Sequence, residues 1–106
     1  MPKFMVHGSY TAEGLKGLLK EGGTGRRKAV ESAVKAMGGR LEAYYFAFGD
    51  SDVVTIVDVP DNVTAAALAI GIASTGTVGV KTTVLMTAEE VDQATKKTVS
   101  FRAAGQ

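Results

Sequence analysis

The sequence predicts an α+β fold whose elements follow the order β-α-β-β-α-β, ahead of a short C-terminal extension. Runs rich in β-branched and aromatic residues alternate with runs whose apolar residues recur at helical spacing. Glycine, proline and helix-capping residues separate these runs. The chain has 106 residues and no cysteine. It therefore has the size of a single domain, and it has no disulfide framework.

The first two elements are a strand over residues 3–10 and a helix that Thr11 begins, because its hydroxyl can accept from an unpaired backbone N–H. The glycine-rich stretch 22–25 is expected to interrupt this helix as a flexible surface loop. Alternatively, its free N–H groups and the cations beside it would bind an anion. The helix resumes over 26–37, and the glycine pair 38–39 ends it.

The middle of the sequence predicts a β-hairpin. Residues 40–48 form the most strand-like run, and a turn over 49–51 leads into a second strand over 52–59. Pro60 ends this strand because it cannot donate to a sheet ladder. Asp50 and Asp52 flank the turn, where their side chains are expected to bond nearby backbone N–H groups rather than a metal ion.

The remaining elements of the domain are an apolar helix and a fourth strand. Asp61 or Asn62 should cap the helix, which runs over residues 63–74. Because this helix is apolar nearly all round, we expect it to be buried on more than one side. The fourth strand is expected over residues 77–86, which completes the βαββαβ order.

The C-terminal part of the chain differs from the rest in charge. Thr87 and Glu90 form a capping box for a short last helix, which completes a domain over residues 1–97. The first 92 residues carry a net charge of −2 and the last 14 carry +3. The tail, residues 98–106, is a solvated segment, an arm that docks on another copy of the chain, or a weak nucleic-acid arm. Two of its residues are candidates for an added edge strand: Val99 and Phe101.

This order of elements is that of the ferredoxin-like fold, in which two helices cover one face of a four-stranded antiparallel sheet. The other face should carry polar residues if it meets water. Neither alternate set of residues in the two hairpin strands is cleanly polar, so a monomer would expose an apolar patch. We therefore expect a homodimer, or a higher homo-oligomer, whose open sheet faces pack around a cavity.

A set of short motifs in a fixed order resembles the GYD-domain proteins of the dimeric α/β-barrel superfamily. The motifs are Tyr10-Thr11-x-x-Gly14-Leu15, Arg26, Gly38-Gly39-x-Leu41, Gly49-Asp50-Ser51-Asp52-Val53-Val54, Pro60-Asp61 and Gly76. The resemblance runs from about Phe4 to Val91. It implies a ferredoxin-like fold and paired subunits, but no established reaction. The wider superfamily contains cofactor-free monooxygenases, haem-handling enzymes, isomerases and ligand-binding regulators, so fold alone selects none of them. Ser51 stands where the family has its tyrosine.

His7 is the single histidine and lies in the middle of the first strand. If Phe4 and Val6 face the helices, alternation places His7 on the open face and in the expected cavity. There it would form a hydrogen bond at the dimer seam, contact a ligand, act as an acid or base near neutral pH, or ligate haem iron.

Aromatic residues of the second strand are the next candidates. Because Leu41 and Ala43 resemble a helix-facing set, we expect Tyr44, Phe46 and Phe48 to point into the cavity, with Glu42 at its rim. They would be ordinary packing on a sheet face, or an apolar wall for a planar or aromatic ligand. Asp58 interrupts an apolar strand, as a carboxylate near solvent or as a partner of His7.

These observations favour a small cytosolic homodimer that binds a small apolar or aromatic molecule through His7, Tyr44, Phe46, Asp58 and, less directly, Glu42. One alternative is a cofactor-free monooxygenase or isomerase that uses His7 as acid or base. Another is a structural assembly module with a filled barrel. The net charge of +1 argues against a dedicated nucleic-acid binder, and no apolar run approaches the roughly 20 residues of a membrane span. No motif indicates a metal site or a cofactor.

Overall fold

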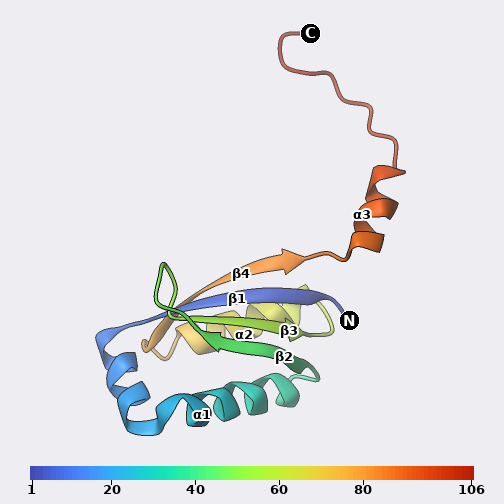
Figure 1. Ribbon diagram of the computed structural model, residues 1–106. Helices are drawn as coiled ribbons and strands as arrows, with labels where there is room; N and C mark the ends of the chain where they lie inside the picture. Colours follow the sequence, from blue (N-terminus) through green and yellow to red (C-terminus); the bar gives the residue numbers. More distant parts are fainter.

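The computed structural model describes all residues, 1–106, and confirms the α+β class with a four-stranded antiparallel sheet (Figure 1). The strands are β1 (Lys3–Tyr10), β2 (Arg40–Phe46), β3 (Val53–Asp58) and β4 (Val78–Leu85). The helices are α1 (Ala12–Ala36), α2 (Asn62–Ala73) and α3 (Ala88–Thr95). The βαββαβ elements and the short last helix that the sequence predicts are present. Their helix caps and strand ends are local signals in the sequence.

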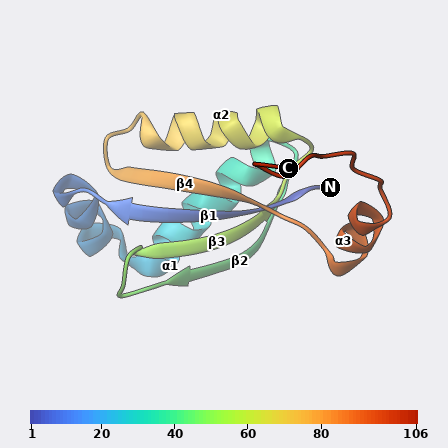
Figure 2. The same ribbon diagram turned by 90° about the horizontal axis from the view of Figure 1, so that it is seen from above.

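The strands lie side by side in the order β2-β3-β1-β4, which places β1 and β3 at the centre of the sheet. β1 pairs antiparallel with β3 on one side and with β4 on the other. His7 marks the middle of this register, opposite Val54 of β3 and Lys81 of β4. Both α1 and α2 lie on one side of the sheet, and no element covers its other face (Figures 1 and 2).

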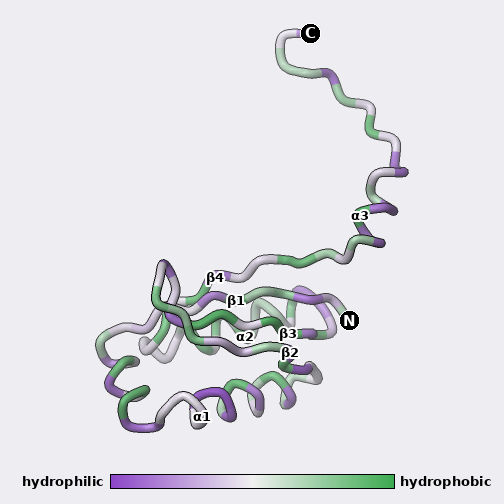
Figure 3. The backbone as a smooth tube through the Cα atoms, in the orientation of Figure 1, coloured by the Kyte–Doolittle hydropathy of each residue, from purple (hydrophilic) through white to green (hydrophobic).

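The hydrophobic core fills the space between the sheet and the two helices. Its buried members come from β1, α1, β3 and α2, and from the residue that follows β3: Phe4, Val34, Val57, Ala65 and Val59. Hydrophobic residues run through the central strands, whereas α1 alternates in character along its length (Figure 3). Burial of each valine or phenylalanine side chain contributes roughly 1.5–3 kcal/mol, so this one layer holds both helices to the sheet.

The glycine-rich stretch 22–25 belongs to α1. The helix changes direction at Gly22, whose φ of 78° lies in the left-handed region that glycine adopts without steric strain. Helical structure continues on both sides of this kink. The predicted interruption is therefore at the right place, but the predicted flexible loop is wrong.

The apolar helix α2 is buried on one side only. Ala65 faces the core and is 8% exposed, whereas Val63 and Ile70 are 78% and 70% exposed. The prediction of burial on several sides is wrong for the single chain, because the sheet is the only layer that α2 contacts closely within it. Its outer face remains an apolar surface.

The segment after Leu85 leaves the body of the molecule. The predicted capping box is present: the Thr87 side chain accepts from the Glu90 N–H, and the Glu90 carboxylate accepts from the Thr87 N–H. The segment projects from the end of β4, on the side of the sheet away from α1 and α2 (Figure 1). No strand forms at Val99 or Phe101, so that expectation is wrong. No helix of the chain combines the length and the apolar character that a membrane crossing needs.

Candidate functional site

A β-bulge in β2 decides which of its side chains face the helices. Glu42 is an extra residue between two paired positions of the strand. Leu41, before the bulge, pairs on the helix-covered face, and the extra residue places Tyr44 and Phe46 on that same face. The prediction that Tyr44, Phe46 and Phe48 face the open side is therefore wrong: the first two face the helices, and Phe48 is fully exposed beyond the end of the strand.

The two aromatic side chains of β2 pack together beneath α1. The rings of Tyr44 and Phe46 lie edge to face, with centroids 5.4 Å apart and an interplanar angle of 77°. The Phe46 ring lies against Gly23 of α1, where an added Cβ would approach it to 2.9 Å. These rings fill part of the space between α1 and the sheet.

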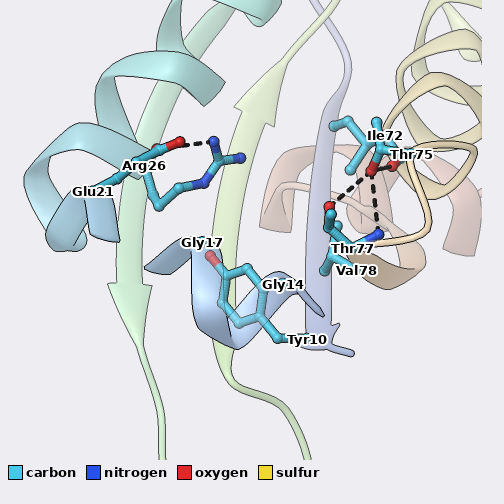
Figure 4. Close-up of a pocket in the computed structure, with 9 residues that line it drawn as sticks. All are labelled: Tyr10, Gly14, Gly17, Glu21, Arg26, Ile72, Thr75, Thr77 and Val78. Atoms are coloured by element: carbon cyan, nitrogen blue, oxygen red, sulfur yellow. Dashed lines mark hydrogen bonds and ion pairs between the residues drawn. The ribbon is translucent and has the colours of Figure 1, made fainter. Parts of the chain in front are cut away.

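A cleft of about 320 Å³ opens between the start of α1 and the turn that joins α2 to β4 (Figure 4). Its walls include aromatic, aliphatic, hydroxyl and charged side chains from four elements and this turn, among them Tyr10, Arg26, Ile72, Thr75, Thr77 and Val78. A narrower slot of about 50 Å³ continues it toward Tyr44 and is lined mostly by apolar residues. The cleft reaches the size range of small-molecule sites, roughly 300–1,000 Å³.

Close contact between α1 and the α2–β4 turn forms one wall of the cleft. The Thr11 N–H donates to the Thr77 carbonyl over 2.9 Å, and the Thr11 hydroxyl donates to the Gly76 carbonyl over 2.9 Å. Gly14 permits this approach, since a Cβ there would overlap the Thr77 carbonyl oxygen. At Gly17, by contrast, a Cβ would meet nothing within 4 Å. The cleft is therefore open at Gly17.

Four polar side chains line the inner part of the cleft: Tyr10, Arg26, Tyr44 and Thr55. Arg26 Nη1 lies 3.3 Å from Glu21 Oε2, across the kink of α1. Glu21 is the single acidic residue of the lining. Figure 4 shows the Arg26 guanidinium and the Tyr10 hydroxyl across the cleft from Thr75 and Thr77.

The surroundings of these side chains set their protonation. Burial raises the pKa of Tyr44, and the nearby Tyr10 hydroxyl raises it further. Burial lowers the pKa of Arg26, but Glu21 and Tyr10 together raise it by more. Near neutral pH the cleft therefore presents a neutral Tyr44 hydroxyl beside a charged guanidinium.

His7 lies on the open face, where alternation along β1 placed it. It is half-buried, and its Nδ1 lies 3.3 Å from the Ser51 hydroxyl oxygen. This is the one hydrogen bond of its side chain, and no carboxylate pairs with the ring. The sheet separates His7 from the cleft, because its neighbours Val6 and Gly8 on β1 point to the helix side.

Asp58 and Glu42 lie at the end of the sheet that holds the chain's N-terminus. Asp58 forms ion pairs with Lys3 over 2.7 Å and with Arg40 over 2.8 Å, and Lys3 also reaches Glu42 over 3.1 Å. The register places Asp58 four residues along β3 from the partner of His7, roughly 13 Å away at 3.3 Å per residue. The hypothesis that Asp58 pairs with His7 is therefore wrong.

The rest of the open face is largely apolar on β1, β2 and β3, whereas β4 adds the exposed Lys81 beside His7. Its half-buried or exposed members include side chains from β1, β2 and β3: Met5, Ala43, Tyr45, Val54 and Ile56. Tyr45, near the end of the edge strand β2, is 71% exposed. Such a contiguous surface is typical of a protein–protein contact.

The hairpin carboxylate Asp52 has a long-range role. Its Oδ2 accepts from the backbone N–H of Tyr10 over 2.8 Å, and its own N–H donates to the Gly8 carbonyl. The expected local turn bond of Asp52 is therefore replaced by a bond to the end of β1. This bond holds the backbone of Tyr10 where its ring enters the cleft.

The cleft residues Tyr10, Arg26, Thr75 and Thr77 were not among the predicted binding residues. They are far apart in the sequence, and only the folded sheet and the kink of α1 bring them together. One signal was available: Tyr10 and Arg26 both belong to the ordered motifs of the family resemblance.

An antiparallel sheet with two helices on one face and none on the other defines a ferredoxin-like α+β domain. The sequence model of the GYD domain matches residues 4–95, and the chain belongs to the GYD-domain family. Neither the curated proteins nor the solved structures contain a significant match to it.

Proposed function

We propose that this GYD-domain protein is a homodimeric small-molecule-binding protein whose ligand occupies the cleft between α1, the α2–β4 turn and the sheet. The observation that carries the proposal is the cleft itself. It joins aliphatic and aromatic walls to a few convergent polar groups, which is the usual composition of a ligand site. Gly17 leaves the cleft open, and Gly14 and Thr77 fix its wall.

This position differs from the one expected from the sequence, between two facing sheets. Of the five ligand-binding residues predicted from the sequence, Tyr44 lines the inner slot of the cleft. Phe46 lines a neighbouring apolar groove of about 480 Å³ with Leu15 and Leu19. We keep Tyr44 as a ligand-binding residue and add Tyr10 and Arg26.

The open face of the sheet supports the homodimer. A second copy packed against Met5, Tyr45, Val54 and Ile56 would remove these side chains from water. The segment after Leu85 projects toward the side on which that copy would lie (Figure 1). It would enlarge the contact, which for a stable pair is roughly 800 Å² per subunit.

The two alternatives have less support. Catalysis by His7 would need a substrate on the open face, since the sheet separates this residue from the cleft. A purely structural module with a filled barrel would leave the cleft of about 320 Å³ on the helix side without a role.

Native mass spectrometry of freshly purified protein tests the proposal through three forms: wild type, Gly17→Leu and Gly71→Leu. The Gly17→Leu side chain should fill the cleft. Gly71→Leu places the same side chain on α2, at a position that is also open but outside the cleft. We expect dimers in all three, with added small-molecule mass on wild type and Gly71→Leu alone. A bare monomeric wild type, or added mass that Gly17→Leu retains, would contradict the proposal.

A further inference from the structure

We infer that the cleft selects an anion, namely a planar aromatic carboxylate whose charge is received by Arg26 while its ring enters the apolar slot beside Tyr44. This inference rests on the proposed function and adds to it the charge and the chemical class of the ligand.

The first support is the balance of charge at the inner part of the cleft. Arg26 is the single cation of the lining, and of its guanidinium nitrogens only Nη1 has a protein partner, Glu21. Tyr10 and Tyr44 line the same inner slot as this guanidinium. A planar guanidinium fork matches the two oxygens of a carboxylate, which gives short, charge-assisted hydrogen bonds.

The second support is the weak hold of Glu21 on that cation. The Glu21 side chain is 47% exposed at the rim, and its contact with Arg26 is long, at 3.3 Å. A solvated ion pair of this kind contributes little to stability. A ligand carboxylate placed deeper, against Arg26 and the tyrosine hydroxyls, therefore competes well for the guanidinium.

The third support is the shape and polarity of the inner slot. It is lined by aliphatic side chains, among them Val30, Ile72, Val78 and Val80, and its volume is about 50 Å³. Narrow apolar walls accept a flat ring and disfavour a hydrated phosphate.

The threonines of the α2–β4 turn do not change the preference of the cleft for an anion. The Thr75 hydroxyl donates to the Ile72 carbonyl over 2.8 Å, and its oxygen lies 2.8 Å from the Thr77 hydroxyl. Both hydroxyl groups therefore satisfy each other and the turn. Selection of the ligand charge falls to Arg26.

A matched pair of probes tests the inference: benzoate and its neutral isostere benzamide, titrated by NMR into the wild-type protein. We expect benzoate to bind at least about ten-fold more tightly, which is the effect of one charge-assisted hydrogen bond. Arg26→Gln should remove this preference. Arg27→Gln changes the neighbouring exposed arginine, which does not line the cleft, and should keep it.

The outcomes separate this inference from the proposed function. Equal binding of both probes, lost together in Gly17→Leu, would overturn anion selection and leave the cleft as a binding site. Binding of neither probe by folded wild-type protein would count against both proposals. If Arg26→Gln does not fold, Arg26→Lys keeps the charge without the planar fork, and a weakened but surviving benzoate preference would support the inference. An unchanged preference in either Arg26 variant that folds would overturn it.

Discussion

The Nζ atom of Lys3 lies 2.7 Å from Oδ1 of Asp58, at the point where the first strand of the sheet begins and its neighbour ends. Arg40 approaches the other oxygen of the same carboxylate over 2.8 Å. Asp58 is 6% exposed, so its charge is removed from water and compensated by two cations from two strands. This ion-pair cluster holds β2, β3 and β1 in register at one end of the sheet, away from the cleft.

Asp58→Asn should lower the free energy of unfolding by about 2 kcal/mol, the range of a lost hydrogen bond to a charged group. The amide keeps the shape of the side chain but removes the charge that faces Lys3 and Arg40. Urea denaturation measures the change. Asp50→Asn, at an exposed carboxylate that forms no ion pair, is the control and should be neutral. Equal stability of both variants would show that the cluster is not structural.

The same carboxylate predicts a dependence of stability on pH. The hydrogen bond from Lys3 lowers the pKa of Asp58; burial opposes this effect and Arg40 adds to it. A folded pKa below the unfolded value, about 3.9, means that the ionised form stabilises the fold above that pH. The stabilisation is lost as the pH falls through the folded pKa. The difference in unfolding free energy between wild type and Asp58→Asn should therefore be full at neutral pH and shrink below about pH 4. A difference that grows in acid would have the wrong sign.

Two glycines of α1, one helical turn apart, should respond in opposite directions to the same substitution. Gly14→Ala places a methyl group against the Thr77 carbonyl and should destabilise the protein by about 1–3 kcal/mol, as for overpacking. Gly17→Ala meets open space and should stabilise it by about 0.5–1 kcal/mol through helix propensity. Thermal or urea unfolding of both variants measures this. Changes of the same sign would contradict the geometry of the cleft wall.

The open face should govern the number of subunits. Ile56→Asp places a charge on that face and should dissociate the proposed dimer, because the carboxylate would be buried in the contact without a partner. Ile70→Asp is the matched control, because Ile70 lies on the outer face of α2 and is 70% exposed. This variant should remain dimeric. Sedimentation velocity at micromolar concentration distinguishes the two, with circular dichroism as the check on folding. A monomeric wild type would rule out the assembly.

The elements of the fold were predictable because their signals are local. Thr11, Asp61 and Thr87 begin helices by accepting from N–H groups three residues away, and such bonds need no tertiary contact. The direction of the β2 side chains was not predictable in this way. The bulge at Glu42 is defined by the pairing partner of β2, and one extra residue reversed the assignment of Tyr44.

The candidate site was hidden for a related reason. Tyr10, Arg26 and Thr77 belong to a strand end, a kinked helix and a turn, and no spacing in the sequence relates them. The positive φ of Gly22 turns the second half of α1, which carries Arg26, relative to the first. The glycine stretch indicated a break at this place. The direction that the helix takes after the break depends on how its second half packs against the sheet, which the sequence does not show.

Methyl NMR during a benzoate titration tests most directly which side of the sheet holds the ligand. The methyl groups of Ile72 and Val78 line the cleft, whereas those of Val54 and Ile56 lie on the open face of the same sheet. We predict that saturable shifts appear at the first pair and not at the second, and that Gly17→Leu abolishes them. Saturable shifts confined to Val54 and Ile56 would place the ligand between facing sheets and contradict the account.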